Sequence, residues 1–388
     1  EHRTKVMTRV SIPFPDSNQS TLALPSTWGP KLLPLAACML LAVIACGGDD
    51  APGLQDTNWT RAQRLESLLT TLAADSMEGR RTGTTGAHRA AEFLATELAR
   101  YGIEPAGDNG TYVQTVPMAR ITEETTDGPR ERFTLEIDYE SWEALPAESI
   151  ITTESNIIGI IRGSDPEVAN QAIVLGAHYD HLGIGSPTLD SEGVLDSIYN
   201  GADGNGSGAA AVLEIARELI QGRAPLRTIV FLLSTGEELG LLGTRYYIAN
   251  PVIPLHQTVA DLQIERIGRV DDAAGGFGKS WLTGYERTTL GDQLAASKSH
   301  IVPDPRPEED FFFRSDNVAF AVLGIPAHTM SSFGLHPDHH QPSDEVDLID
   351  FEHMSAVVDA AVELVRLLAD GPITDWKEGG REGLQNYW

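Results

Sequence analysis

Cysteine is scarce in this chain. The 388 residues include two cysteines, Cys38 and Cys46, and both lie near the N-terminus. Cys38 stands inside an apolar segment with the features of a removable leader, so the mature chain would keep Cys46 alone. We therefore expect no internal disulfide and no thiolate ligand for a metal ion. Any metal ion must be held by histidine, aspartate or glutamate.

Positive charge is also in short supply. The sequence has 28 lysine and arginine residues against 56 aspartate and glutamate residues, a formal net charge of -28. Nucleic acids are bound through clustered Lys and Arg, so this balance argues against a nucleic-acid partner. Solubility alone is a sufficient reason for the acidity. The hydrophobic content of 41% is ordinary for a soluble globular protein, and the length allows a large core in one or two domains.

Long hydrophobic runs are lacking too. The apolar segment Leu32–Ala45 follows Lys31 and is shorter than the roughly 20 residues that a membrane helix needs. It ends in VIACG, which resembles a bacterial lipoprotein cleavage box with Cys46 as the acylated residue. We expect a leader with a lipoprotein-type signal at 1–50 and a tether at 51–58. The protein would then lie in a bacterial cell envelope, on the periplasmic or extracellular side, with a lipid on Cys46 as its only membrane contact.

What the chain does have is an alternation of short apolar segments with amphipathic ones. This pattern is typical of a doubly wound α/β fold, in which helices flank a mostly parallel central sheet. We expect strands at 157–161, 173–175, 227–233, 259–264, 280–283 and 327–330. We expect helices at 59–74, 87–101, 208–219, 239–247 and 351–368, with Ser207 as the cap of the third.

These elements predict a single α/β domain at 59–370. The segment 119–154 is acidic and poorly periodic, and we interpret it as a short insertion. Residues 371–388 are predicted to form a C-terminal tail on the surface, which Trp376 and Trp388 would dock if they pack against the domain.

Polar side chains follow successive predicted strands. His178 and Asp180 come after the second strand, Glu237 and Glu238 after the third, and Glu265 after the fourth. His340 precedes the last helix. In open α/β sheets, the carboxyl ends of the strands border a common crevice where ligands bind. Imidazole and carboxylate groups are zinc ligands, so the pattern predicts a metal site at this edge.

The adjacent pair Glu237 and Glu238 suits a hydrolytic metal site. Neighbouring residues in a tight turn point in different directions, so one carboxylate can bind metal while the other accepts a proton from water. The alternative is a pair of acids near a helix start, stabilised by the helix macrodipole. The nearby histidines favour the catalytic interpretation.

An ordered set of motifs carries a family resemblance. GAHYDHLG, GADGNGSG, STGEELGLLG, IERIGR, RSDN, GIPAHT and HHQPSDE occur in this order between Trp59 and Leu368. Together they resemble the co-catalytic zinc metallopeptidases of the bacterial leucyl aminopeptidase and aminopeptidase Y type. Glutamate carboxypeptidase II and the glutaminyl cyclases belong to the same family.

The resemblance implies a role for each motif residue. His178 would bind the first zinc ion, and Asp180 would orient that histidine. Glu237 would be the general base. Glu238 and His340 would bind the second ion, and Glu265 the first. The resemblance assigns no ligand role to three neighbouring histidines, which we expect to be structural or to face the substrate: His181, His336 and His339.

Two positions depart from the family pattern. Glu265 stands where the family has aspartate, and because the charge is kept we expect it still to bind metal. Gly204 stands where the family has an aspartate that bridges the two ions. Either Asp203 replaces that acid, or the site holds one ion or is weakened. Without a bridge, each ion would keep two protein ligands, below the three usual at catalytic zinc sites.

The resemblance implies a zinc-dependent aminopeptidase that acts on peptides with a free N-terminus, with two ions, or one if the bridge is missing. Two alternatives stay open: a glutaminyl-peptide cyclotransferase with one zinc ion, and a catalytically weakened binding lipoprotein. An aromatic group would line a side-chain pocket if it is not part of the core: Tyr285, Phe311, Phe312, Phe313 and Phe333.

Overall fold

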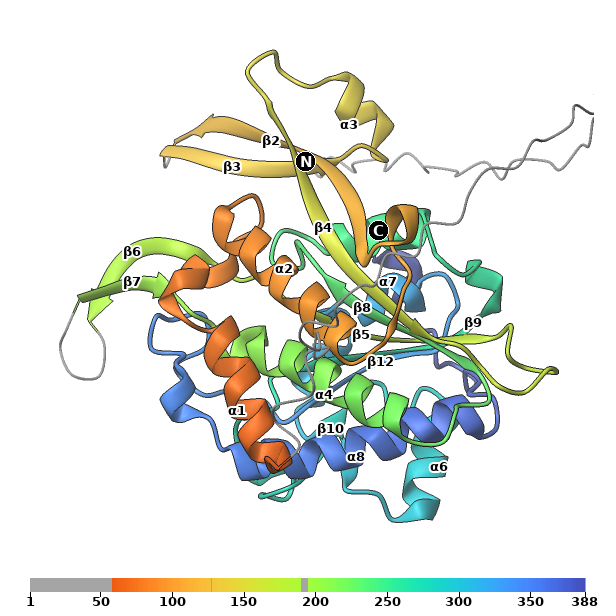
Figure 1. Cartoon of the computed structure of the whole chain (residues 1–388). Helices are drawn as coiled ribbons and strands as arrows, with labels where there is room; N and C mark the ends of the chain where they lie inside the picture. Colours follow the sequence, from red (N-terminus) through yellow and green to blue (C-terminus); the bar gives the residue numbers. More distant parts are fainter. Residues whose placement is uncertain (1–57, 127, 190–194, 388) are drawn as a thin grey trace, which may run out of the picture. The chain divides into compact units, whose positions relative to one another are not determined.

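A large sheet forms the centre of the fold (Figure 1). The computed structural model describes residues 58–126, 128–189 and 195–387. The sheet has ten strands in the order β11-β10-β12-β9-β5-β8-β4-β2-β3, with β1 paired to β4. The strands are β1 (Glu104–Pro105), β2 (Val113–Thr125), β3 (Gly128–Leu135), β4 (Ile150–Ile161), β5 (Ala172–His178), β8 (Thr228–Ser234), β9 (Thr258–Glu265), β10 (Ser280–Leu282), β11 (Ile301–Pro303) and β12 (Ala327–Ser331).

The four central strands β12, β9, β5 and β8 run parallel, and strands on both sides extend the sheet with antiparallel pairs. Every residue of β5 and of β8 is buried. Strands covered on both faces read as unbroken apolar runs, which is why the short segments near 173 and 229 predicted central strands. The predicted α/β fold class is confirmed.

Helices cover both faces of the sheet. Alternate side chains of a strand point to opposite faces, so Ile173 and Leu175 enter one apolar core and Val174 enters another. The first core lies under α1 (Arg61–Leu72), α2 (Thr85–Arg100), α4 (Ser207–Gln221) and α8 (Phe351–Asp370). The second lies under α5 (Leu242–Ala249) and α7 (Asn317–Ala321), and α6 (Thr289–Ser297) packs beside β11.

The acidic segment that we interpreted as an insertion is built into the sheet. β2 and β3 form an antiparallel pair, and β2 pairs with the long β4, so the sheet runs on beyond its parallel centre. The short helix α3 (Tyr139–Glu143) follows β3, and together these elements form a lobe at the top of Figure 1. The strand character of 113–135 was missed because the outer half of β2 and much of β3 are exposed and polar. Their pairing with β4 supplies the order that their composition does not indicate.

One further expectation is corrected. Ser207 is the first residue of α4 rather than its cap, since Gly206 precedes the helix and the Asn205 side chain accepts a hydrogen bond from the Gly208 amide. The C-terminal segment is attached to the domain, because the Trp376 indole donates to the Gly324 carbonyl at 2.8 Å. Trp388 lies outside the described residues.

The leader at 1–50, with Cys38 and Cys46, and all but the last residue of the tether at 51–58 also fall outside the described residues. Among the helices that the structure does describe, none combines the length and the apolar character needed to cross a membrane. A separate hairpin, β6 (Gly183–Leu189) and β7 (Leu195–Tyr199), projects from the side of the domain (Figure 1).

Candidate metal centre

Three adjacent parallel strands bring most of the predicted site residues to one edge. His178 is the last residue of β5 and Glu265 the last residue of β9. Glu237 and Glu238 follow the end of β8 by a few residues, and β5 lies between β8 and β9. Because the strands are parallel, their carboxyl ends meet. His340 reaches the same place from the loop between β12 and α8.

A first group consists of His178, Glu237 and Glu265, each of which offers one ligand atom, all within 4.8 Å of one another. His178 Nε2 lies 3.7 Å from a Glu237 oxygen and 3.8 Å from a Glu265 oxygen. This nitrogen is buried and has no hydrogen-bond partner. Ligands at about 2.0–2.2 Å from a tetrahedral zinc ion lie about 3.3–3.6 Å apart, so the spacing and the unpartnered nitrogen fit a zinc ion.

A second group consists of His181, Glu238 and His340. One oxygen of Glu238 lies 3.2 Å from His181 Nδ1 and 3.1 Å from His340 Nε2. The two imidazole rings are edge to face, with centroids 5.4 Å apart. Two imidazoles and a carboxylate that converge on one point also fit a zinc ion.

Asp180 holds both groups in place. Its carboxylate accepts hydrogen bonds from the backbone amides of Glu237 and Glu238, at 3.1 and 3.4 Å, and from the Thr82 hydroxyl at 3.2 Å. His178 Nδ1 lies 3.1 Å from the Asp180 carbonyl oxygen, which directs Nε2 toward the first group. One buried acid therefore positions residues of both groups, the kind of outer support that orients metal ligands.

Arg80 fixes the loops behind the second group. This fully buried guanidinium donates to four backbone carbonyls, those of Leu72, Tyr179, Asn200 and Gly201. Burial lowers the pKa of Arg80 to about 10, although the negative charges of Asp344, Asp180 and Glu238 act to raise it. The arginine still carries its charge at neutral pH, and it connects the loop after β5 to the turn before α4.

The turn at 203–204 contributes to neither group. One Asp203 oxygen accepts from the Gly268 amide at 2.8 Å and from the Ser207 hydroxyl at 3.0 Å. The other lies 3.2 Å from His336 Nε2. Asp203 is thus held inside the turn and belongs to neither group, so its role as a replacement for the missing bridge stays a prediction.

Charge and burial shift several pKa values. Burial, reinforced by Glu265 and Glu238, raises the pKa of Glu237 well above its ordinary value although His178 opposes the shift. Burial disfavours a charged His178, but Glu237, Asp180 and Glu265 outweigh it and raise the pKa of that histidine. Burial lowers the pKa of His181 to about 4 despite Glu238, so its imidazole is neutral. Neutral imidazole is the form that binds metal.

The two groups border a cavity of about 130 Å³. Three aromatic side chains form part of its wall: Trp281, Phe311 and Phe333. The aromatic group expected from the sequence is therefore divided. Phe312 packs in the core, Phe313 stacks on Tyr387, and Tyr285 packs against the other core.

His181 is the residue that the sequence reasoning missed as a ligand candidate. It follows Asp180 directly, and the resemblance gave it no ligand role; a second histidine three residues after the first was the available signal. His339 lines the cavity and lies beside His340, with ring centroids 3.9 Å apart, but it belongs to neither group.

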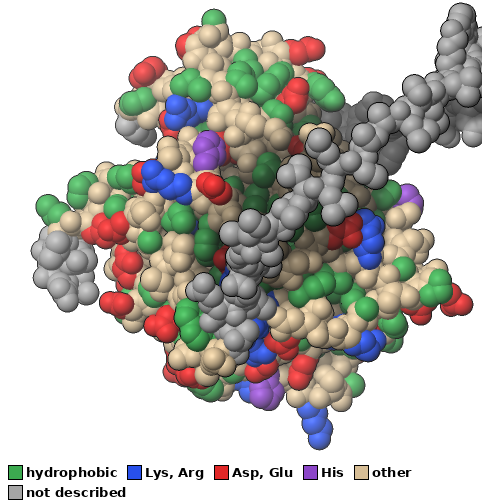
Figure 2. All heavy atoms as spheres, in the orientation of Figure 1, with side chains coloured by type: hydrophobic (Ala, Val, Ile, Leu, Met, Phe, Trp, Pro, Cys, Tyr) green, Lys and Arg blue, Asp and Glu red, His purple; other side chains and the backbone are tan. Residues whose placement is uncertain are grey.

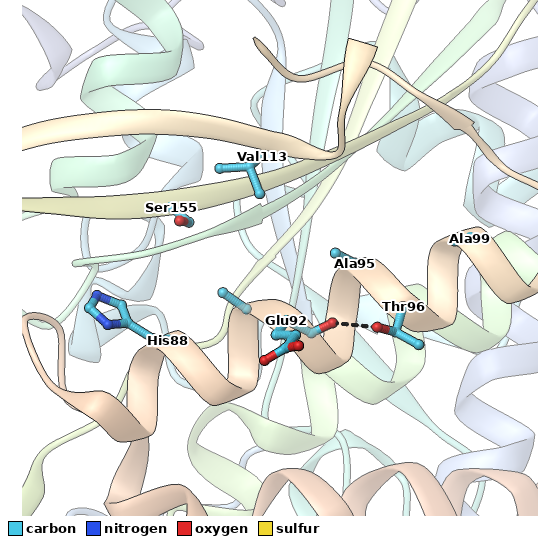
Figure 3. A pocket seen from close by; sticks show the side chains of 8 residues that line it. His88, Glu92, Ala95, Thr96, Ala99, Val113 and Ser155 are labelled. Atoms are coloured by element: carbon cyan, nitrogen blue, oxygen red, sulfur yellow. Dashed lines mark hydrogen bonds between the residues drawn. The ribbon is translucent and has the colours of Figure 1, made fainter. Parts of the chain in front are cut away.

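A larger hollow, of about 420 Å³, lies away from the metal centre between α2 and strands β2 and β4 (Figure 3). His88 at one end lies 3.4 Å from the buried carboxylate of Glu154. The Thr96 hydroxyl donates a hydrogen bond to the Glu92 carbonyl at 2.8 Å. Acidic side chains are spread over the face of the molecule seen in Figure 2. This hollow offers no group of converging ligands like those at the strand ends.

Residues 156–365 match the sequence pattern of peptidase family M28. The chain belongs to this family. The match spans β4 to α8 and contains both metal-ligand groups.

Curated relatives include a probable leucine aminopeptidase 1 of Trichophyton verrucosum, 27% identical over 230 residues, which are 52% of this chain and 54% of the relative. Leucine aminopeptidase 1 of Trichophyton equinum is 36% identical over 103 residues, 25% of this chain and 24% of the relative. The M28 chain thus spans about half the length, or less, of these relatives.

Solved structures share the fold. An aminopeptidase from Aneurinibacillus sp. strain AM-1 superposes with a TM-score of 0.54 at 16% identity, over 81% of this chain and 95% of that one. A zinc aminopeptidase from Bacillus subtilis superposes with a TM-score of 0.54 at 16% sequence identity, and the match covers 80% of this chain and 96% of that one. Porphyromonas gingivalis glutaminyl cyclase superposes with a TM-score of 0.50 at 18% sequence identity, and the match covers 78% of this chain and 97% of that one.

Proposed function

We propose that this M28 protein is a zinc-dependent aminopeptidase that removes N-terminal residues from peptides. The observation that carries the proposal is the pair of ligand groups on adjacent strand ends beside a small, partly aromatic cavity. Leucine aminopeptidases among the relatives and a zinc aminopeptidase among the structural neighbours support it. The substrate would be a peptide with a free N-terminus.

The chain's own residues divide the work. His178 and Glu265 would hold one ion, Glu238 and His340 would hold the other, and Asp180 orients His178 and the turn that carries the two glutamates. The Ser315 hydroxyl donates to Glu265 and fixes its carboxylate. Zinc bound there would polarise the substrate carbonyl and lower the pKa of water toward about 7.

Glu237 is the proposed general base. A base works best when its pKa lies near the working pH, and burial beside Glu265 and Glu238 raises the pKa of this carboxyl. Glu237 accepts the proton of the attacking water and returns it to the leaving amine. Carboxylates at the cavity hold the α-ammonium group, and the aromatic wall meets the first side chain.

The test is Glu237→Gln, assayed on amino-acid p-nitroanilides. We expect turnover to fall about 10²- to 10⁴-fold, the usual contribution of general-base catalysis, with bound zinc unchanged. Glu308→Gln is the matched control, since Glu308 is exposed and belongs to neither group. Unchanged turnover would remove Glu237 from this role. A lost zinc ion would make it a ligand instead.

A second candidate is a glutaminyl-peptide cyclotransferase with one ion. Gly204 favours it, because no carboxylate is available at that position to bridge two ions, and a glutaminyl cyclase shares the fold. In this reaction the N-terminal amine of glutamine attacks its own side-chain amide and ammonia leaves. Release of ammonia from a glutaminyl peptide, with no cleavage of p-nitroanilides, would establish this activity and reject the first.

We also propose that the protein works in a bacterial cell envelope, anchored through Cys46. The support is the sequence of 32–47 alone. Metabolic labelling with a fatty-acid analogue tests it: label on the wild type and not on Cys46→Ser is the expected result, and label on neither would reject the anchor.

A further inference from the structure

The second ligand group needs a third protein ligand. Glu238 and His340 alone supply two, whereas catalytic zinc sites usually have three. Residue 204, which faces this region, is glycine, and a Cβ atom placed there would lie 3.7 Å from the His181 ring and 3.7 Å from Arg266 Nε. The preceding residue, Asp203, contacts Ser207, Gly268 and His336 through its carboxylate.

Opposite charges flank the position of the missing bridge. Arg266 Nη1 lies 3.7 Å from Glu265, and an Asp344 oxygen would lie 3.6 Å from a Cβ atom at residue 204. The Asp344 carboxylate accepts from the backbone amides of Asp203 and Gly204 and pairs with Arg269, so it is held within the turn. Neither Asp203 nor Asp344 belongs to a ligand group.

His181 is the side chain in position to complete the second site. It is fully buried, and its backbone amide donates to the Arg80 carbonyl at 3.3 Å, so the loop that carries it is anchored. Its Nδ1 lies 3.2 Å from the Glu238 oxygen that His340 also approaches. The three ligand atoms lie within 4.8 Å of one another.

We propose that His181, Glu238 and His340 form a separate, unbridged zinc site in which His181 Nδ1 takes the place of the missing carboxylate. The proposal rests on the proposed function only for the identity of the metal. Binding through Nδ1 requires the ring proton to be on Nε2, which is buried without a protein partner.

The test is a Zn²⁺ titration of the metal-free full chain against a chromophoric chelator, with bound zinc counted by elemental analysis. We expect two ions on the wild type. His181→Gln, which keeps a hydrogen-bond donor for Glu238, should weaken one of them about 100-fold or more, since loss of an outer partner alone costs 10- to 100-fold. His256→Ala is the matched control and should bind both ions within about two-fold of the wild type, since His256 is exposed and belongs to neither group.

Double variants show which of the two ions is weakened by His181→Gln. His181→Gln with His340→Ala should still bind one ion at wild-type affinity, because both changes affect the same site, whereas His181→Gln with His178→Ala should bind no ion at wild-type affinity. Two ions bound at wild-type affinity by His181→Gln would overturn the proposal, and so would equal weakening of both ions. If the protein binds two ions as described but cleaves no N-terminal residue, the proposed function fails while this site stands.

Discussion

The two ligand groups at the strand ends are built differently. The first joins one imidazole to two carboxylates, and its three side chains are 1%, 11% and 8% exposed. The second joins two imidazoles to one carboxylate, and its His340 side chain is 36% exposed. In the first, His178 Nε2 lies beyond hydrogen-bond distance of its acids; in the second, imidazole and carboxylate are already within it.

The difference follows from what carries each group. His178 and Glu265 end two buried parallel strands, so the sheet fixes their separation and keeps the unpartnered nitrogen in place. His340 lies on a loop and Glu238 in a turn, so no pairing within the sheet fixes their separation. We infer that the first group is the tighter and more slowly exchanging site, and the second the adaptable one.

Removal of His178 should have the largest effect. His178→Ala takes the only imidazole from the first group, so we expect that ion to be lost and peptidase activity to fall about 10²- to 10⁴-fold, because metal polarisation contributes several kcal/mol. Zinc content and p-nitroanilide turnover measure both. His256→Ala, at an exposed histidine, is the control. If His178→Ala retains both ions, the proposal that His178 binds the first ion is wrong.

His340→Ala tests whether the two sites are independent. We expect about 100-fold weaker binding of one ion and no change in the other, because no residue is common to the two groups. Competition titration with a chelator resolves the two affinities. If the affinity for both ions falls together, the sites are coupled and the comparison drawn above does not hold.

Asp180→Asn should weaken zinc binding at both groups. The carboxylate of Asp180 supports the turn that carries Glu237 and Glu238, one member of each group. We expect both zinc affinities to fall about 30-fold, within the usual range for an outer partner. Competition titration with a chelator measures both affinities. Weakening confined to one ion would show that Asp180 supports only that site.

Ser315→Ala should give the smallest effect and the most selective one. The Ser315 hydroxyl donates to Glu265, which is a member of the first group. We expect about 10-fold weaker binding at the first site and unchanged binding at the second. Ser164→Ala removes a hydroxyl that donates to the Pro225 carbonyl, and it should leave both affinities unchanged. Equal affinities for Ser315→Ala and wild type would mean that Glu265 needs no such support.

Sequence reasoning succeeded where local pattern and burial agree. The buried runs near 173, 229 and 260 predicted β5, β8 and β9, and parallel strand ends share an edge, so the convergence of His178, Glu238 and Glu265 was foreseeable. It failed at β2 and β3, whose exposed halves carry polar residues and whose strand form depends on pairing with β4.

The sequence by itself determined the α/β fold, the family and the set of oxygen and nitrogen ligands, because these depend on apolar periodicity and residue type. Only the tertiary structure decided which ligands belong together. It joined His181 to Glu238 and His340, and it committed Asp203 to the Gly268 amide and His336. These contacts join residues far apart in the chain, and which of two neighbouring side chains faces an ion is set by backbone direction after packing rather than by spacing along the sequence.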